Sequence, residues 1–336
     1  MPFSHHSHSG QFCGHAANTL EEVVQNAISK SMTTFCLTEH VARERADFYP
    51  EEENDHTPET LTKLYDDFYQ EARRLQTAYA AQIQLFVGFE GEWIRDSSRG
   101  TINDLLEKYD MDLFVGSVHH VHAVPIDYDT PLYHKARELA GGSDERIFGD
   151  YLDAQYEMVK ALRPPVVGHF DLIRLKSDEP DRSFQTWPAV WNKVIRNLRF
   201  IAGYAGVLEL NSSSLRKGMR EPYPQVEICE VIHTARNSLE NVLILCSSQI
   251  LLIMLQAFLV MGGRFTLSDD SHGIEQVGLN YGKVLDAVKK AGVSELQVLA
   301  PVSEVTHALK PDHRFAHVCW RAVPIAELES YKFWNQ

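Results

Sequence analysis

The stretch QLFVGFE (residues 84–90) is a short apolar run that ends in a carboxylate. Five more short runs, rich in apolar or β-branched residues, also end in a polar side chain: TTFCLTEH (33–40), DLFVGSVHH (112–120), PVVGHFD (165–171), GVLELN (206–211) and RFTLSDDSH (264–272). Longer amphipathic segments separate them, and this alternation predicts repeated β-strand and α-helix units. In a parallel barrel, the strands supply catalytic groups at one mouth. The repetition therefore favours an α/β barrel with one shared site.

Helices are predicted between these runs. Thr19 and Glu22 have the spacing of a capping box, which predicts a helix that runs to about Ser31. Thr57 followed by Pro58 predicts a second helix, which continues to about Ala81. Further helices are expected over about 144–162, 184–204 and 279–291. Two long polar stretches, near 41–58 and 122–145, are expected to be insertions that rim the mouth of the barrel.

Composition narrows the class of protein. The 336 residues are 44% hydrophobic and 23% charged, as in a globular chain, and α/β barrels of this length commonly form a single domain. The net charge of −14 argues against nucleic acid or an anionic membrane surface as a partner. An anionic substrate stays compatible with this charge if bound cations reverse the local field. Five scattered cysteines and no recognisable signal peptide predict a cytoplasmic protein.

The N-terminal stretch SHSGQFCGHA (7–16), preceded by two histidines, places four imidazoles within fifteen residues. They could be solvated histidines or a tag remnant, but other histidines and acids end the predicted strands. In an H-x-H pair on extended backbone both side chains point to one face, as do those of a D-x-H pair. The candidate metal ligands are His6, His8, His15, His40, Glu90, His119, His169, Asp270 and His272. One ion takes fewer ligands, so two or three ions bridged by Glu90 are predicted.

These motifs resemble those of the PHP (polymerase and histidinol phosphatase) superfamily, and the whole set resembles its histidinol-phosphate phosphatase branch. The resemblance runs from about Ser4 to Gly273, through the motifs HSHSGQFCGHA, LTEH, GFEGEW, VGSVHH, VGHFD, ELN and SDDSH. It implies a distorted (β/α)7 TIM-like barrel with a trinuclear metal site.

The resemblance also implies three groups of ligands: His6, His8, Glu90 and Asp270; Glu90, His119 and His169; and His15, His40 and His272. The family pattern D-x-H selects Asp270, with Asp269 as the alternative, and His120 is the alternative to His119. Zinc, iron and manganese all suit such donors. Cys13 is expected to be a buried thiol rather than a ligand. Three acids are expected to orient imidazoles or to be structural: Glu92, Asp171 and Glu209.

Phosphate recognition is expected from Arg174 in LIRL and from Arg216 and Lys217 in NSSSLRKG, with solvated surface roles as the alternative. Glu90, Asp270 and His272 are the predicted catalytic residues of a metal-dependent in-line attack of water on phosphorus. The family substrate is L-histidinol phosphate, which gives L-histidinol and phosphate in histidine biosynthesis. The chain is thus expected to be a histidinol-phosphatase.

Three alternatives to this function stay open. The chain could hydrolyse another small phosphate ester, or it could be a metal-binding module without catalytic activity. An amidohydrolase-like barrel would need a carbamylated lysine at a strand end, and the six runs lack one.

The apolar stretch NVLILCSSQILLIMLQAFLVMGG (241–263) is long enough to raise the question of a membrane span. A single crossing would separate the last two candidate ligands from the others. Polar residues interrupt the stretch, so a buried helix is preferred: Ser247, Ser248, Gln249 and Gln256. Compared with the family, the segment near 231–255 is an atypical apolar insertion.

Overall fold

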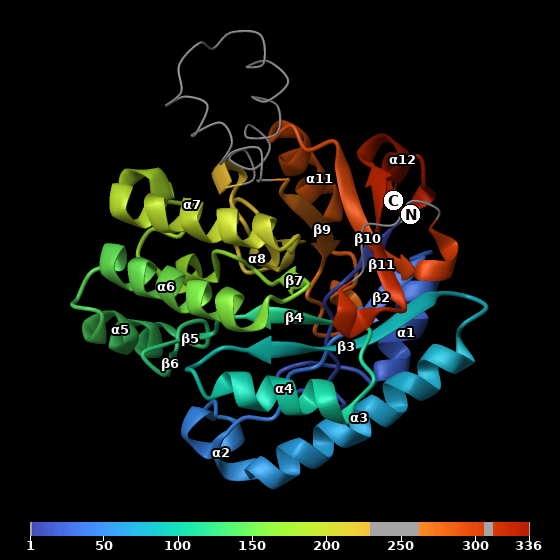
Figure 1. Cartoon of the computed structure of the whole chain (residues 1–336), viewed down its shortest axis with the longest axis horizontal. Coiled ribbons are helices and arrows are strands. Elements are labelled where there is room, and N and C mark those ends of the chain that lie inside the picture. Colours follow the sequence, from blue (N-terminus) through green and yellow to red (C-terminus); the bar gives the residue numbers. More distant parts are fainter. Residues whose placement is uncertain (1, 229–261, 306–311, 336) are drawn as a thin grey trace, which may run out of the picture.

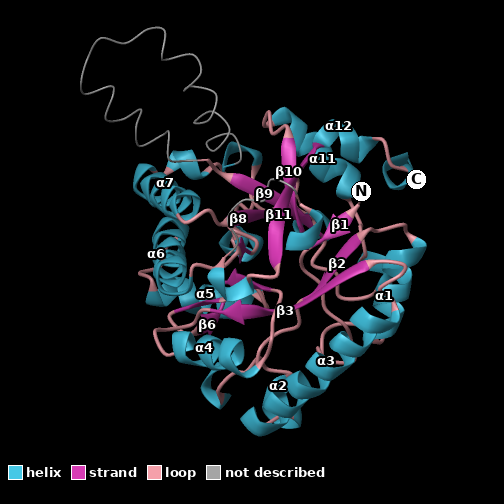
Figure 2. Cartoon of the chain, turned by 45° about the vertical axis from the view of Figure 1, so that its right-hand side comes forward, coloured by secondary structure: helices cyan, strands magenta, loops and turns pink. Residues whose placement is uncertain are grey.

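The computed structural model describes residues 2–228, 262–305 and 312–335. Seven parallel strands form its central sheet, in the order β1-β2-β3-β4-β7-β8-β9 (Figures 1 and 2). They are β1 (Phe3–Ser4), β2 (Thr34–Leu37), β3 (Gln84–Glu92), β4 (Leu113–Ser117), β7 (Val166–Val167), β8 (Val207–Asn211) and β9 (Arg264–Ser268). The His5 amide donates to the Leu267 carbonyl at 3.3 Å, and Ser7 pairs with Ser271, so β1 lies beside β9. The predicted distorted (β/α)7 barrel is confirmed.

Five of these strands lie within predicted runs, and β3 begins with the run 84–90 and extends two residues beyond it. The remaining one, β1, has two residues and is too short to show a hydrophobic pattern. Gly88 in β3 illustrates how closely the strands approach, since a Cβ at this position would lie 2.4 Å from the Leu113 carbonyl oxygen. A residue without a side chain is needed at that contact.

Helices surround the strands (Figure 2). They are α1 (Leu20–Ser29), α2 (Glu52–Asp55), α3 (Pro58–Ala78), α4 (Ser98–Lys108), α5 (Thr130–Leu139), α6 (Asp144–Leu162), α7 (Pro188–Gly203), α8 (Ser213–Arg216), α11 (Tyr281–Lys290) and α12 (Ile325–Glu329). The capping box of α1 is present, because Thr19 Oγ1 accepts from the Glu22 amide and the Glu22 carboxylate accepts from the Thr19 amide. The five predicted helices correspond to α1, α3, α6, α7 and α11.

The segment 122–145 is more ordered than a rim loop. It contains α5 and the second strand of a short hairpin, β5 (His120–Val121) and β6 (Val124–Pro125). Asp129 caps α5 through the Leu132 amide, a local signal that the polar composition of the segment concealed. Helix α4 was also not predicted, and only Ile102 on it is buried.

The C-terminal part adds an antiparallel hairpin, β10 (Glu295–Pro301) and β11 (Val318–Pro324). Its backbone is tied to the barrel by the Leu299 amide, which donates to His5 Nε2 at 3.0 Å. His317 lies 2.7 Å from Asp112 at the start of β4. This segment therefore packs against the end of the barrel where the strands begin.

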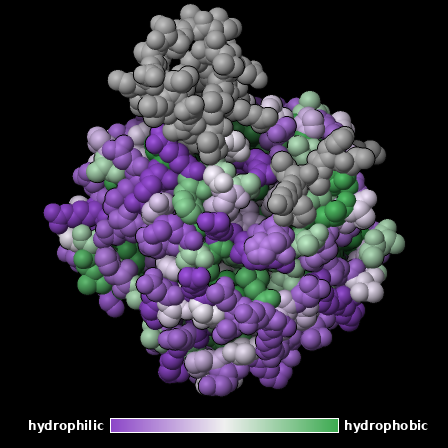
Figure 3. All heavy atoms as spheres, in the orientation of Figure 1, coloured by the Kyte–Doolittle hydropathy of each residue, from purple (hydrophilic) through white to green (hydrophobic). Residues whose placement is uncertain are grey.

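No helix within the described residues is both long and apolar enough to cross a membrane. Figure 3 shows hydrophilic residues over most of one face, with hydrophobic residues only in small separate groups. Most of the apolar stretch at 241–263 and the whole predicted insertion near 231–255 lie outside the described residues.

Candidate metal centre

All nine predicted ligands come together at the mouth where the strands end. Glu90 is at their centre, near the C-terminal end of β3, and its side chain is 1% exposed. Its Oε2 faces three imidazoles, those of His6 (3.4 Å), His8 (3.6 Å) and His40 (3.0 Å). Its Oε1 faces two others, those of His169 (2.9 Å) and His119 (3.3 Å). The carboxylate therefore lies between two groups of histidines, as a bridging ligand would.

Asp270 follows β9 and faces the same cluster. Its Oδ1 lies 3.6 Å from His8 Nε2 and 3.6 Å from His272 Nδ1. The residue has φ 48°, a left-handed conformation that aspartate tolerates better than most side chains. Ser213 Oγ donates to its Oδ2 at 3.1 Å. The backbone and this hydrogen bond together direct the carboxylate into the mouth.

The neighbouring Asp269, the alternative ligand, has a different environment. It accepts hydrogen bonds from the Ser4 hydroxyl (3.0 Å), the Ser271 amide (3.1 Å) and the Gly278 amide (2.7 Å). These contacts anchor β1 and the loop after β9. Asp269 is therefore placed as a structural residue, and the geometry favours Asp270.

The third predicted group lies toward solvent. The rings of His15 and His272 stack with centroids 5.0 Å apart, and those of His15 and His40 are 5.5 Å apart. Cys13 Sγ lies 3.3 Å from His15 Nε2. Burial raises the pKa of this thiol well above its usual value, and the side chain is buried as predicted.

Four sets of potential ligand atoms within 4.8 Å of one another occur among the described residues. They are Cys13, His15, His40 and His272; His6, His8 and Asp270; His8, His40 and Glu90; and Glu90, His119 and His169. The first, second and fourth sets resemble the three groups expected from the sequence. The first contains Cys13 in addition, and the second lacks Glu90. Which of these residues bind metal stays a prediction.

Buried carboxylates lie behind the imidazoles. Glu209 Oε1 is 2.7 Å from His6 Nδ1, and Glu39 Oε1 is 2.9 Å from His8 Nδ1. A carboxylate at Nδ1 holds the ring proton there and leaves Nε2 as a lone pair that faces the mouth. Glu209 also accepts from the His169 amide at 2.7 Å, so one side chain positions two candidate ligands.

This arrangement fits a bound cation. His6 Nε2 and His8 Nε2 are only 3.1 Å apart, and both face the carboxylate of Glu90. Two lone pairs and a carboxylate at such distances repel one another unless a proton or a metal ion lies between them. Burial opposes a charge on His6, yet Glu90, Glu209 and Asp270 together raise its pKa well above the usual value. Imidazole and carboxylate donors fit divalent metal ions, so the residues suit the implied cofactor.

The alternative ligand His120 and two of the expected supporting acids, Glu92 and Asp171, can now be placed. His120 Nδ1 is 2.6 Å from Glu92, which holds its ring away from Glu90. Glu92 is also 3.4 Å from His119 Nδ1, so it contacts the preferred candidate as well. Asp171 contacts Arg174 and the Gln225 amide rather than an imidazole, which makes it structural.

Glu39 was not among the predicted residues. It accepts from the Ser9 amide at 3.1 Å in addition to its contact with His8. Burial raises its pKa to about 7, although His40 and the Ser9 amide act in the opposite direction. Its position directly before His40 in LTEH, at the end of an apolar strand, was the available signal.

A cavity of about 370 Å³ opens over the cluster. Arg216 and Lys217 line it, and the Arg216 guanidinium donates to the backbone carbonyls of Asp269 (3.2 Å) and Asp270 (3.1 Å). These two basic residues are thus at the rim, where phosphate recognition would place them. The rest of the lining is His15, His40, Tyr49, Glu51, Glu90, His119, Asp127, Tyr128, His169, Leu172, Asp270, His272 and Gln276.

The prediction for Arg174 needs correction. This arginine is buried, does not line the cavity, and pairs with Asp171 at 2.9 Å. Its guanidinium also donates to the backbone carbonyls of Pro222 (2.6 Å) and Glu221 (3.0 Å), and it lies 4.9 Å from the Tyr223 ring. With these donors occupied, Arg174 supports the loop after β8 rather than contacting a phosphate.

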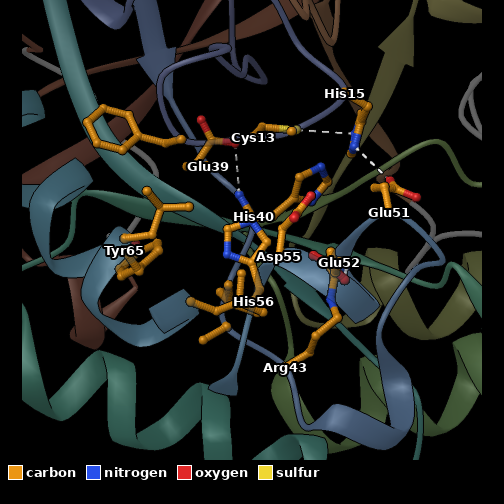
Figure 4. Close-up of a pocket in the computed structure, with 16 residues that line it drawn as sticks. Cys13, His15, Glu39, His40, Arg43, Glu51, Glu52, Asp55, His56 and Tyr65 are labelled. Atoms are coloured by element: carbon orange, nitrogen blue, oxygen red, sulfur yellow. Dashed lines mark hydrogen bonds and ion pairs between the residues drawn. The ribbon is translucent and has the colours of Figure 1, made fainter. Parts of the chain in front are cut away.

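A smaller cavity of about 150 Å³ adjoins the centre on the other side of His15 and His40 (Figure 4). The segment 41–58 forms its opposite wall, with Glu51, Glu52 and Asp55 directed toward it. Glu51 lines both cavities. The segment 41–58 therefore contributes to the lining of both cavities, and its description as an insertion stays a prediction.

The family model for the PHP domain matches residues 4–213 of the chain, which is more than half of its length. The chain belongs to the PHP family. A Schizosaccharomyces pombe protein named "Probable histidinol-phosphatase" is 40% identical over 298 residues, which cover 88% of this chain and 89% of the relative. The histidinol-phosphatase of Saccharomyces cerevisiae is 31% identical, with 98% of each chain covered. These relatives belong to the branch that the motifs indicated.

The fold of this PHP chain is also that of a solved structure. Histidinol phosphate phosphatase from Lactococcus lactis, in complex with zinc, L-histidinol and phosphate, has a TM-score of 0.61 and 19% sequence identity. The match covers 88% of this chain and 95% of the bacterial one. This likeness confirms the barrel.

Proposed function

We propose that this chain is a metal-dependent phosphomonoesterase that hydrolyses L-histidinol phosphate to L-histidinol and phosphate, a step of histidine biosynthesis. One observation carries the proposal: eight imidazole and carboxylate side chains from distant parts of the sequence converge around Glu90 at the barrel mouth. Relatives with this activity in their names match over 88% and 98% of the chain, which supports the same substrate.

The proposal includes two or three divalent metal ions, of zinc, iron or manganese. When bound, such ions activate water as a nucleophile and neutralise charge on the phosphoryl oxygens. The residues that would hold them are His6, His8, His15, His40, Glu90, His119, His169, Asp270 and His272. Among these, Glu90, Asp270 and His272 are proposed to be essential to catalysis through the ions that they hold.

The chain's own basic groups have a separate role. Arg216 and Lys217 are proposed to bind the phosphate oxygens from the rim of the cavity. Asp270 is held between Arg216, which fixes its backbone carbonyl, and Ser213, which fixes its carboxylate. Substrate binding and the ligand geometry are therefore coupled through one loop.

The test is phosphate release from L-histidinol phosphate by the purified protein, before and after chelation, with elemental analysis of both samples. We expect activity that chelation removes and that one of the three metals restores. Full activity in a sample shown to be free of metal would refute the mechanism. Metal binding without hydrolysis of any phosphate ester would favour the non-catalytic alternative.

We also propose that the enzyme acts in the cytoplasm on this small molecule. The three cysteines that the structure describes are buried free thiols: Cys13, Cys36 and Cys319. Free thiols are typical of a reducing compartment. Localisation of a tagged chain by fluorescence microscopy tests this directly, and a signal confined to an organelle would contradict it.

A further inference from the structure

The walls of the cavity over the metal centre carry opposite charges. Arg216 and Lys217 line one part, whereas Glu51 and Asp127 line another together with the rings of two tyrosines, Tyr49 and Tyr128. The acids follow β2 and β6, and the bases follow β8. The hairpin that contains β6 follows β4 in the chain. In the barrel, β7 lies between β8 and β4, and two strands, β9 and β1, lie between β8 and β2. The acidic wall and the basic wall therefore lie apart around the mouth.

The acidic wall has unused hydrogen-bonding capacity. The Glu51 side chain is 31% exposed and its carboxylate interacts with the Tyr128 hydroxyl, while its Oε2 makes no further hydrogen bond among the described residues. A carboxylate oxygen has two lone pairs, so this partly exposed group can accept further hydrogen bonds from a ligand or from water. Its other oxygen, Oε1, is 3.6 Å from His15 Nδ1 (Figure 4).

Asp127 is similarly available. The Tyr49 hydroxyl donates to its Oδ1 over a long 3.5 Å. Within the described residues, no lysine or arginine forms an ion pair with Asp127 or Glu51. Two carboxylates on one wall of a cavity, without a cation of the protein between them, favour a cationic group on the ligand.

The segment that presents Glu51 is firmly attached to the barrel. Arg43 is buried, with its guanidinium 3.0 Å from Glu52 and 3.4 Å from Glu92 on β3. Arg95, just after β3, forms a second ion pair with Asp47. A binding group held on such a support needs little ordering when the ligand arrives.

We propose that Glu51 and Asp127 recognise the ammonium group of the substrate while Arg216, Lys217 and the metal centre hold its phosphate. The inference rests on the proposed function and adds to it the residues that select a phosphate ester with an ammonium group over one that lacks it. Tyr49 positions Asp127 through its hydroxyl, and the Tyr128 ring, 5.8 Å from that of Tyr49, extends the same wall.

The test compares L-histidinol phosphate with 3-(imidazol-4-yl)propyl phosphate, the same ester without the ammonium group. The ratio of kcat/KM for the two esters is measured for the wild type, E51Q, D127N and the double variant. A charge-assisted hydrogen bond lost in each variant lowers this ratio on the order of 10-fold or more. E53Q is the matched control, because Glu53 is an exposed neighbour that does not line either cavity.

Direct binding separates recognition from turnover. Calorimetric titration with L-histidinol is expected to show weaker binding to E51Q and D127N, whereas titration with inorganic phosphate is expected to give wild-type affinity. A wild type that prefers the ammonium ester, with variants that keep this preference, would overturn the assignment while leaving the proposed function intact. A wild type that hydrolyses neither ester would overturn the proposed function, and the assignment with it.

Discussion

Replacement of Glu39 by glutamine tests whether the carboxylates behind the imidazoles prepare the metal centre. Glu39 Oε1 accepts from His8 Nδ1 at 2.9 Å, and Oε2 accepts from the Ser9 amide at 3.1 Å. Glutamine offers one acceptor and one amide donor at nearly the same volume. The change therefore removes one of two acceptors and leaves the packing intact.

The magnitude follows from the two ways in which the glutamine can lie. If its NH₂ faces His8, the ring proton moves to Nε2, the atom that must face the metal. If its NH₂ faces the Ser9 amide, two donors oppose each other, and a buried unsatisfied donor costs about 1–3 kcal/mol. The metal-free chain adopts the cheaper first arrangement, and metal binding forces the second. Affinity for metal is thus expected to fall about 10- to 100-fold.

The assay is competition for zinc between the metal-free protein and a chromophoric chelator at fixed pH. The control is Glu107→Gln, an exposed position on α4 that lines neither cavity. Circular dichroism verifies that each variant is folded. A zinc affinity of Glu39→Gln within twofold of the wild type would refute the claim that Glu39 fixes the proton of His8.

Further predictions separate structural from functional residues. Asp270→Asn is expected to lower phosphate release about 100-fold or more without a large change in Tm, whereas Asp269→Asn should keep the metal and lose about 1–3 kcal/mol of unfolding free energy in urea titrations. Arg174→Met should lower the free energy of unfolding by about 3–5 kcal/mol, because it leaves Asp171 buried without its ion-pair partner. Arg216→Met should mainly raise KM. A raised KM for Arg174→Met together with a loss of stability for Arg216→Met would contradict both placements. Burial lowers the pKa of His5 to about 4, so between pH 6.5 and 4 the unfolded chain binds the proton that the folded chain rejects. Stability should therefore fall by up to about 3 kcal/mol as the pH decreases through this window, and His5→Gln should lack this part of the loss.

The barrel could be predicted because its signals are local. Each long strand is an apolar run with a polar end, and the caps at Thr19 and Thr57 define two helix starts. The parts that were missed lack such signals. Strand β1 has two residues, and its place is set by the backbone contact of His5 with Leu267 rather than by hydrophobic pattern.

The candidate ligands could also be predicted, because a barrel brings strand ends together whatever their separation in the sequence. The direction of a side chain in the loops beyond the strands could not be predicted in this way. Arg174 and Arg216 both follow strands that end in site residues, yet one is enclosed by carbonyl groups and the other reaches the cavity. Only tertiary packing distinguishes them, since both stand three to five residues beyond similar motifs.

The buried acids show why the candidate metal ligands were easier to predict than the carboxylates that position them. Glu90 and Asp270 face the mouth, whereas Glu39 and Glu209 lie behind histidines and make contact only with donors of the protein. Both kinds are buried carboxylates at strand ends, so the sequence presents them alike. Their roles differ because both oxygens of Glu90 and Oδ1 of Asp270 face several imidazole nitrogens, which favours a bound cation, whereas Glu39 and Glu209 accept from an Nδ1 and a backbone amide and are already satisfied. The chemistry of the centre is therefore decided by which carboxylate oxygens the fold turns toward imidazole nitrogens at the mouth.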